Sequence, residues 1–163
     1  MKPVSLNLFL TILAALALSA QTPGKTSQTG LVPTKTVLFV CEHGAAKSVL
    51  ATAEFNRLAE QRGLPWRATA RGTNPDSAIP PAIANSLDKD GMKPEGTPRL
   101  VAEADVRAAA YTITLGATLP NAIAIGNIRD WNVPSPSADL AVARQDIRRR
   151  VAELLAELSR PAK

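Results

Sequence analysis

Residues 36–48 read T-V-L-F-V-C-E-H-G-A-A-K-S, and this stretch decides the fold. Its first five residues are apolar or β-branched, and they predict a buried strand over 36–40. Cys41, the only cysteine of the chain, follows at once, then a short loop that contains Gly44, and a helical pattern begins at Lys47. The stretch therefore predicts a strand, a tight loop and a helix, with a thiol where the strand ends.

This arrangement has the chemistry of an anion site with a nucleophile. Backbone N–H groups in the loop and in the first helical turn have no partner within the helix, so they can bind an oxyanion. The positive end of the helix also favours the thiolate, which is the reactive form of cysteine. A lone cysteine can instead be a small buried core residue. The position of Cys41 between a strand and a helix favours the reactive interpretation, and a single cysteine excludes a disulfide within the chain.

The first twenty residues have the pattern of a secretory signal peptide. An apolar, almost uncharged run at 6–20 ends in the small residues Ser19 and Ala20, a plausible cleavage point. Its length of about 15 residues is short of the roughly 20 that span a bilayer, so cleavage is favoured over a membrane anchor. The chain thus divides into a signal peptide at 1–20, a linker or tail at 21–35 and one domain at 36–160. We expect an exported protein, periplasmic or secreted, that meets a membrane only through an uncleaved signal.

Composition argues against nucleic acid and metal as partners. The formal charge is +5, and much of the excess lies in four arginines between 144 and 150, which we interpret as a solvated helix face. Only 4% of residues are aromatic, so stacking platforms for single strands are missing. There is one histidine and no Cys/His cluster, so we expect no metal site and no cofactor.

Helix and strand patterns alternate along the rest of the chain. The periodicity predicts helices at 46–62, 82–90, 99–108 and 140–158, and strands at 66–71, 110–115 and 128–131. Leu100 and Val142 are expected to face inward from their helices, and Glu54 outward. The alternation predicts an α/β fold, a small doubly wound parallel sheet of about four strands with helices on both faces. Ligands in such sheets bind at the carboxyl ends of strands, where Cys41 stands.

With the strand before it, C-E-H-G-A-A-K-S at 41–48 resembles the low-molecular-weight protein-tyrosine phosphatases and the arsenate reductases that share their fold. Those proteins carry a cysteine, five residues, an arginine and a serine or threonine directly after the first strand. The resemblance continues in order through A-R-G-T at 70–73, the helix at 80–91, T-I-T-L-G at 112–116 and D-W-N-V-P-S-P at 130–136. It covers essentially all of 36–158 and implies a phosphotyrosine phosphatase I-like fold.

The resemblance implies a hydrolase of phosphate monoesters of the protein-tyrosine-phosphatase type. Cys41 would attack phosphorus and form a thiophosphate intermediate, and Ser48 would hydrogen-bond the thiolate. The residues implied to wrap the oxyanion are Glu42, His43, Gly44, Ala45, Ala46, Lys47 and Ser48. The expected partner is a small oxyanion or a phosphorylated substrate.

The sequence departs from the family pattern at several positions. Lys47 replaces the arginine. Lysine offers a point charge, whereas arginine offers a planar fork. Ser135 aligns with the aspartate of a late Asp-Pro pair, and serine cannot protonate a leaving group as a carboxylic acid can. We therefore expect Asp130 to be catalytic with Cys41 and Lys47, although an ordinary contact at a strand end fits Asp130 equally well; Asp139 is less favoured.

Glu42 and His43 are unusual in an anion loop. A carboxylate directed at the anion opposes binding, so Glu42 is expected to point away. His43 is expected to pack or hydrogen-bond the loop, with catalysis the less favoured role. Gly72 and Thr73 are expected to form a turn that supports the loop.

Two alternatives to the hydrolase stay open. One is a catalytically weakened oxyanion-binding protein of the same fold. The other is an arsenate reductase that depends on an external thiol. An internal thiol relay needs a second cysteine, and this chain has only Cys41. Ala117 stands near where the arsenate reductases carry such a resolving cysteine.

Overall fold

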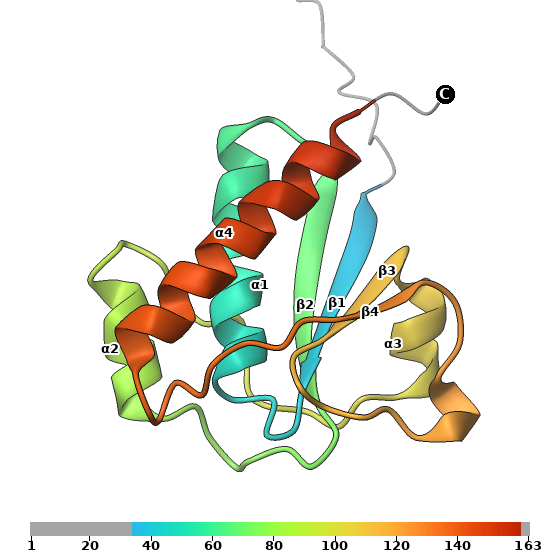
Figure 1. Cartoon of the computed structure of the whole chain (residues 1–163), viewed down its shortest axis with the longest axis horizontal. Helices are drawn as coiled ribbons and strands as arrows, with labels where there is room; N and C mark the ends of the chain where they lie inside the picture. Colours follow the sequence, from blue (N-terminus) through green and yellow to red (C-terminus); the bar gives the residue numbers. More distant parts are fainter. Residues whose placement is uncertain (1–33, 161–163) are drawn as a thin grey trace, which may run out of the picture. The chain divides into compact units, whose positions relative to one another are not determined.

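Four parallel strands form one sheet in the order β2-β1-β3-β4 (Figure 1). The computed structural model describes residues 34–160, so the predicted signal peptide and nearly all of the predicted linker lie outside the described residues. In chain order the elements are β1 Lys35–Cys41, α1 Lys47–Gln61, β2 Trp66–Gly72, α2 Pro81–Asp88, α3 Glu103–Ala108, β3 Tyr111–Thr114, η1 Asn121–Ile123, β4 Ile128–Asp130 and α4 Leu140–Leu158. Within residues 34–160, no helix has the length and apolar character needed to cross a bilayer.

β1 lies inside the sheet and contributes side chains to a core on each face. Val37 and Phe39 point into the larger core, which α1 and α4 cover, and Figure 1 shows these two helices side by side. Leu38 and Val40 alternate with them and point into a smaller core on the other face, next to α3. All four side chains are fully buried. Helices on both faces of a parallel sheet confirm the predicted α/β fold.

The carboxyl end of β1 is the point at which the sheet connections change direction. From β1 the chain passes through α1 to β2 on one side, and then crosses to β3 on the other side of β1. Helix and loop segments diverge at such a switch point and leave a crevice in which ligands bind. Cys41 is the last residue of β1, so the fold places the thiol at this crevice.

Glu54, predicted to face solvent from α1, is instead only 3% exposed. The prediction was wrong because α4 packs along that side of α1 and brings Arg148 to the carboxylate, while Arg57 pairs with it from within α1. The arginines of α4 are paired with carboxylates in the following way: Arg144 and Arg148 with Asp90, and Arg149 and Arg150 with Asp146.

Leu100 and Val142 were also predicted in the wrong orientation. The residues before α3 are extended and pair with β2 at Gly72, so Val101 turns inward and Leu100 is 61% exposed. In α4, Ala143 is buried and Val142 is half exposed. A hydrophobic period fitted to the sequence does not show which of two adjacent apolar residues faces the neighbouring element.

Candidate active site

The Cys41 thiol lies beside a hydroxyl group from the first turn of α1. Sγ of Cys41 is 3.2 Å from Oγ of Ser48, and both side chains are buried. The contact forms because the loop at 42–46 reverses the chain between β1 and α1. When the sulfur is a thiolate, the hydroxyl donates a hydrogen bond to it and stabilises its charge.

The turn after β2 holds the loop at 42–46 in place. The carbonyl oxygens of Cys41, Glu42 and His43 accept hydrogen bonds from the N–H groups of Thr73 (3.1 Å), Asn74 (2.8 Å) and Asp76 (3.0 Å). The C=O and the following N–H of a trans peptide point in opposite directions, so the N–H groups at 42–44 point away from this turn. Within the described residues, no hydrogen bond uses the N–H groups at 42–46. They are available to an oxyanion, and the turn has the supporting role that the sequence predicts.

Two glycines allow the loop and the turn to approach each other. Gly44 has φ +60°, and a Cβ atom on it would lie 2.8 Å from the backbone N of Gly72. A Cβ atom on Gly72 would lie 2.7 Å from the backbone N of Gly44. Any side chain at either position would separate the two segments.

A cavity of about 420 Å³ opens at Cys41. Its lining consists of Cys41, Glu42, His43, Ala46, Lys47, Asp76, Pro80, Leu115, Gly116, Ser135, Pro136 and Ser137. The loop after β1, the turn after β2, the end of β3 and the late loop at 135–137 therefore meet at one place. The size is that of a small-molecule site.

Lys47 supplies a positive charge to this cavity. Its Nζ atom donates to the carbonyl oxygen of Val133 at 3.5 Å. A Cβ atom on Gly116 would lie 3.3 Å from the same Nζ, so the glycine leaves room for the ammonium group. Lysine interacts with an oxyanion as a point charge and lacks the two parallel N–H bonds of arginine.

Some of the predicted oxyanion-binding residues line the cavity, and others are buried behind its wall or border a second cavity. Five predicted site residues line the cavity: Cys41, Glu42, His43, Ala46 and Lys47. Ala45 and Ser48 are fully buried behind the lining, with Ser48 against the sulfur. Gly44 borders a second cavity.

Asp130 is not part of the lining around Cys41. It ends β4, and its Oδ1 accepts hydrogen bonds from Oγ1 of Thr114 at 2.6 Å and from the N–H of Gly116 at 3.3 Å. Asp139, the less favoured acid, caps α4 by accepting from the N–H of Val142 at 3.0 Å. The catalytic role of Asp130 stays a prediction, and in this structure its carboxylate joins β4 to the end of β3.

Asp76 lines the cavity, and the sequence offered no signal for it. Its Oδ1 lies 3.1 Å from Nδ1 of His43, while Nε2 of the same imidazole lies 3.8 Å from Oε2 of Glu42. Ser137 also lines the cavity, and its hydroxyl lies 2.8 Å from that of Ser135. Asp76 and His43 meet because the turn at 73–76 is hydrogen-bonded to the loop after β1.

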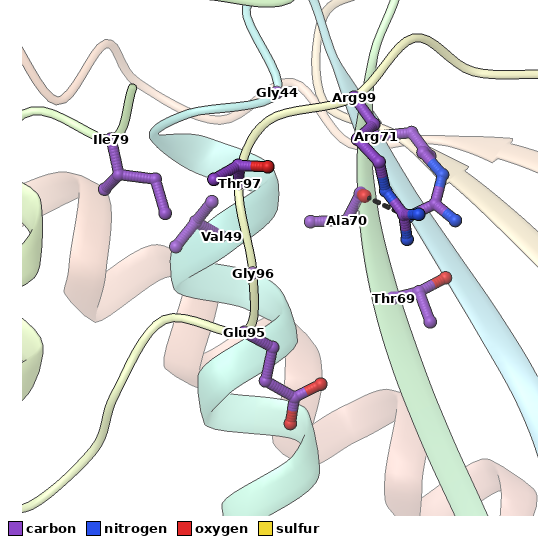
Figure 2. A pocket seen from close by; sticks show the side chains of 10 residues that line it. All are labelled: Gly44, Val49, Thr69, Ala70, Arg71, Ile79, Glu95, Gly96, Thr97 and Arg99. Atoms are coloured by element: carbon purple, nitrogen blue, oxygen red, sulfur yellow. Dashed lines mark hydrogen bonds between the residues drawn. The ribbon is translucent and has the colours of Figure 1, made fainter. Parts of the chain in front are cut away.

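The second cavity, of about 430 Å³, borders Gly44, and the Cys41 thiol is not part of its lining. Figure 2 shows Arg71 and Arg99 close together and Glu95 apart from them. Arg71 donates to Oδ1 of Asp105 at 2.7 Å. Burial opposes the charge on Asp105, but hydrogen bonds from Arg71 and from the N–H of Ala102, with the charges of Arg71 and Arg99, hold its pKa below the usual value. The Arg71 guanidinium is therefore committed to an internal ion pair.

Comparison with known proteins gives a family match and a set of solved structures with the same fold. Residues 36–162 match the family model described as low molecular weight phosphotyrosine protein phosphatase. A comparison with curated proteins found no significant match.

Solved structures share the fold. An arsenate reductase from Archaeoglobus fulgidus DSM 4304 is 27% identical with a TM-score of 0.62, over 74% of this chain and 98% of that one. A low molecular weight protein tyrosine phosphatase from T. tengcongensis is 19% identical with a TM-score of 0.63, over 76% of this chain and 99% of that one. An arsenate reductase in the phosphate binding state is 22% identical with a TM-score of 0.65, over 77% and 99%.

Proposed function

The chain belongs to the low molecular weight phosphotyrosine protein phosphatase family, and on that premise we propose that it is a cysteine-dependent hydrolase of phosphate monoesters. The family and the fold support phosphatase-like or arsenate-reductase-like chemistry, and both kinds of enzyme act on tetrahedral oxyanions. The choice of phosphate monoesters, and of a thiophosphate intermediate on Cys41, is our proposal.

The observation that carries it is the contact between Cys41 Sγ and Ser48 Oγ at 3.2 Å, beside a loop with unused N–H groups. The loop N–H groups at 42–46 bind the non-bridging phosphate oxygens and stabilise the charge that develops on them during transfer. Lys47 adds a positive charge to the same cavity. Ser48 stabilises the thiolate when it departs from phosphorus in the second step.

Turnover of 4-nitrophenyl phosphate by the wild type and by Cys41→Ser tests this function. We expect the wild type to release phosphate and the serine variant to lose that activity, since an alcohol is a far weaker nucleophile than a thiolate. Thermal unfolding of both proteins controls for loss of the fold. Equal rates in the two proteins would contradict the proposal.

A catalytically weakened oxyanion-binding protein is the second candidate, and two observations favour it. Lys47 lacks the fork of arginine, and Ser135 occupies the cavity wall where the family carries its acid. Calorimetric titration with phosphate, arsenate and sulfate tests it, because binding without turnover would identify this function. The absence of binding heat for all three anions would contradict it.

An arsenate reductase that depends on an external thiol is a third candidate, favoured by the fold shared with arsenate reductases. With Cys41 as the only cysteine, the arsenic–thiol adduct would have to be resolved by a separate thiol. Arsenate-dependent consumption of added low-molecular-weight thiols measures this activity, and Cys41→Ser is its control.

We propose further that the protein works outside the cytoplasm, on the strength of the signal-like residues 1–20. N-terminal sequencing of the protein recovered from the periplasm or medium tests this. A mature protein that still begins at Met1 and stays in the cytosol would contradict it.

A further inference from the structure

We propose that His43, oriented by Asp76, donates the proton to the leaving group in the reaction at Cys41. The inference rests on the proposed phosphatase function and assigns its missing acid. It differs from the assignment to Asp130 that the sequence suggests.

The reaction needs a proton donor that the late loop does not provide. An alcohol or phenol that leaves as its anion is a poor leaving group, and general acid catalysis relieves this. Ser135 has no acidic proton to give at neutral pH. Asp130 is outside the cavity lining, and its Oδ1 is engaged by Thr114 and Gly116.

Among the residues that line the Cys41 cavity, the other titratable groups are Glu42, His43, Lys47 and Asp76. Carboxylic acids ordinarily lack their proton at neutral pH, and an ammonium group ordinarily retains its own. Imidazole is the side chain whose ordinary titration lies near neutrality, so it can both give and take a proton there. His43 is thus the member of the lining with suitable chemistry.

Asp76 contacts one side of the imidazole. Nδ1 of His43 lies 3.1 Å from Oδ1 of Asp76, and the backbone N–H of Asp76 donates to the carbonyl oxygen of His43 at 3.0 Å. The two residues are therefore joined through both side chain and backbone. Nε2 lies 3.8 Å from Oε2 of Glu42, too far for a hydrogen bond, and within residues 34–160 no hydrogen bond to this nitrogen is formed. The side chains of His43 and Asp76 are 54% and 45% exposed, as expected at the mouth of a cavity.

The proton and electron pairs balance over two steps. In the first, the Cys41 thiolate forms the S–P bond, the P–O ester bond breaks, and the leaving oxygen takes the proton from Nε2 of the imidazolium. The product alcohol leaves, and His43 is neutral, with its Nδ1 3.1 Å from Oδ1 of Asp76. In the second, Nε2 takes a proton from water as its oxygen bonds to phosphorus. The S–P bond breaks, its electron pair returns to sulfur, and inorganic phosphate leaves.

Two esters with different leaving groups test the inference in the full-length protein. We would measure kcat/KM for phenyl phosphate and 4-nitrophenyl phosphate in the wild type and in His43→Gln, Asp76→Asn and Asp130→Asn. Asp88→Asn, at an exposed position at the end of α2, is the matched control. Since 4-nitrophenolate leaves without a proton, we expect His43→Gln to lose on the order of 10²–10³-fold with phenyl phosphate and less than tenfold with 4-nitrophenyl phosphate. Asp76→Asn should lose less in the same direction, because it removes only the orienting group.

The pH profile provides a second readout. With phenyl phosphate, the pH profile of kcat/KM should differ in shape between the wild type and His43→Gln, since the amide of glutamine cannot transfer a proton. The groups that face His43 are Glu42 and Asp76, with Lys47 in the same lining, and none of them is altered in that variant.

The outcomes separate this inference from the function on which it rests. An equal loss for both esters in His43→Gln, with Cys41-dependent turnover intact in the wild type, would overturn the inference alone. Ester-dependent loss in Asp130→Asn and not in His43→Gln would overturn it in favour of Asp130. A wild type without Cys41-dependent turnover would overturn the phosphatase function, and the inference with it.

Discussion

Sγ of Cys41 and Oγ of Ser48 lie 3.2 Å apart and join the last residue of β1 to the first turn of α1. Both side chains are buried, with Ser48 behind the cavity that Cys41 lines. In the reaction that we propose, the same hydroxyl stabilises the thiolate when the sulfur leaves phosphorus.

Ser48→Ala should slow the second half of the reaction. Without the hydroxyl, the thiolate is a poorer leaving group, and we expect kcat for 4-nitrophenyl phosphate to fall about tenfold, with a burst of nitrophenolate before the steady state. Stopped-flow measurement of the burst checks this. Ser86→Ala is the matched control, because Ser86 is also buried but hydrogen-bonds within α2. A variant with unchanged kcat and no burst would contradict the role of Ser48.

Lys47→Arg should increase turnover if the loop is arranged for phosphoryl transfer. A guanidinium forms two parallel N–H bonds to a phosphate where an ammonium group offers a point charge, and we expect kcat/KM to rise about tenfold. Lys89→Arg, at an exposed position just after α2, controls for the effect of a lysine-to-arginine substitution outside the site. An unchanged rate, with anion binding still seen by calorimetry, would favour the oxyanion-binding function instead.

Gly72→Ala should disturb the loop at 42–46 although Gly72 lies outside it. Its Cβ would lie 2.7 Å from the backbone N of Gly44 and 2.8 Å from the carbonyl oxygen of Glu42, and neither backbone atom moves cheaply. We expect the free energy of unfolding to fall by about 2–3 kcal/mol, with loss of activity.

Gly63→Ala separates this contact from backbone strain. Gly63 has φ +62° and open space around it, so alanine there should cost about 1 kcal/mol through the backbone alone and leave activity unchanged. Urea unfolding and phosphatase assays of both variants measure the difference. Full activity in Gly72→Ala would show that the loop tolerates displacement.

Asp105→Asn should destabilise the protein in a pH-dependent way. Hydrogen bonds from Arg71 and from the N–H of Ala102 lower the pKa of Asp105 in spite of its partial burial, so the stabilisation is complete above the ordinary aspartate pKa of about 4 and is lost as pH falls through the lower folded value. The side chains of Arg71 and Asp105 are only 14% and 21% exposed. We expect the variant to lose about 1–2 kcal/mol of unfolding free energy at pH 7.

The difference between wild type and Asp105→Asn should shrink as the pH is lowered below about 4, because Asp105 of the wild type then also becomes neutral. Urea unfolding at pH 7, 5 and 3 measures it, with Asp88→Asn as the control. A difference that stays constant over this range would show that the ion pair with Arg71 is not its source.

Local patterns were enough to predict the order of the elements and the position of Cys41 at the end of β1. A run of β-branched and apolar residues forms a buried strand wherever it packs, and the helical period after Lys47 requires no knowledge of distant residues. β1 and α1 were therefore found to within a few residues of the predicted bounds. The orientation of Glu54 was not found, since its burial depends on α4, which lies far along the chain.

By itself, the sequence determined that a thiol ends a buried parallel strand in front of a helix N-terminus, because strand, loop and helix are contiguous and each follows from local side-chain chemistry. Only the tertiary structure decided which groups share a cavity with that thiol. Register pairing of β1 with β2 brings the turn at 73–76 onto the anion loop, and so places Asp76 against His43. Pairing of β3 with β4 joins Asp130 to Thr114, and Asp130 is not part of the lining of the Cys41 cavity. The spacing of these two residues along the chain does not reveal that their strands pair.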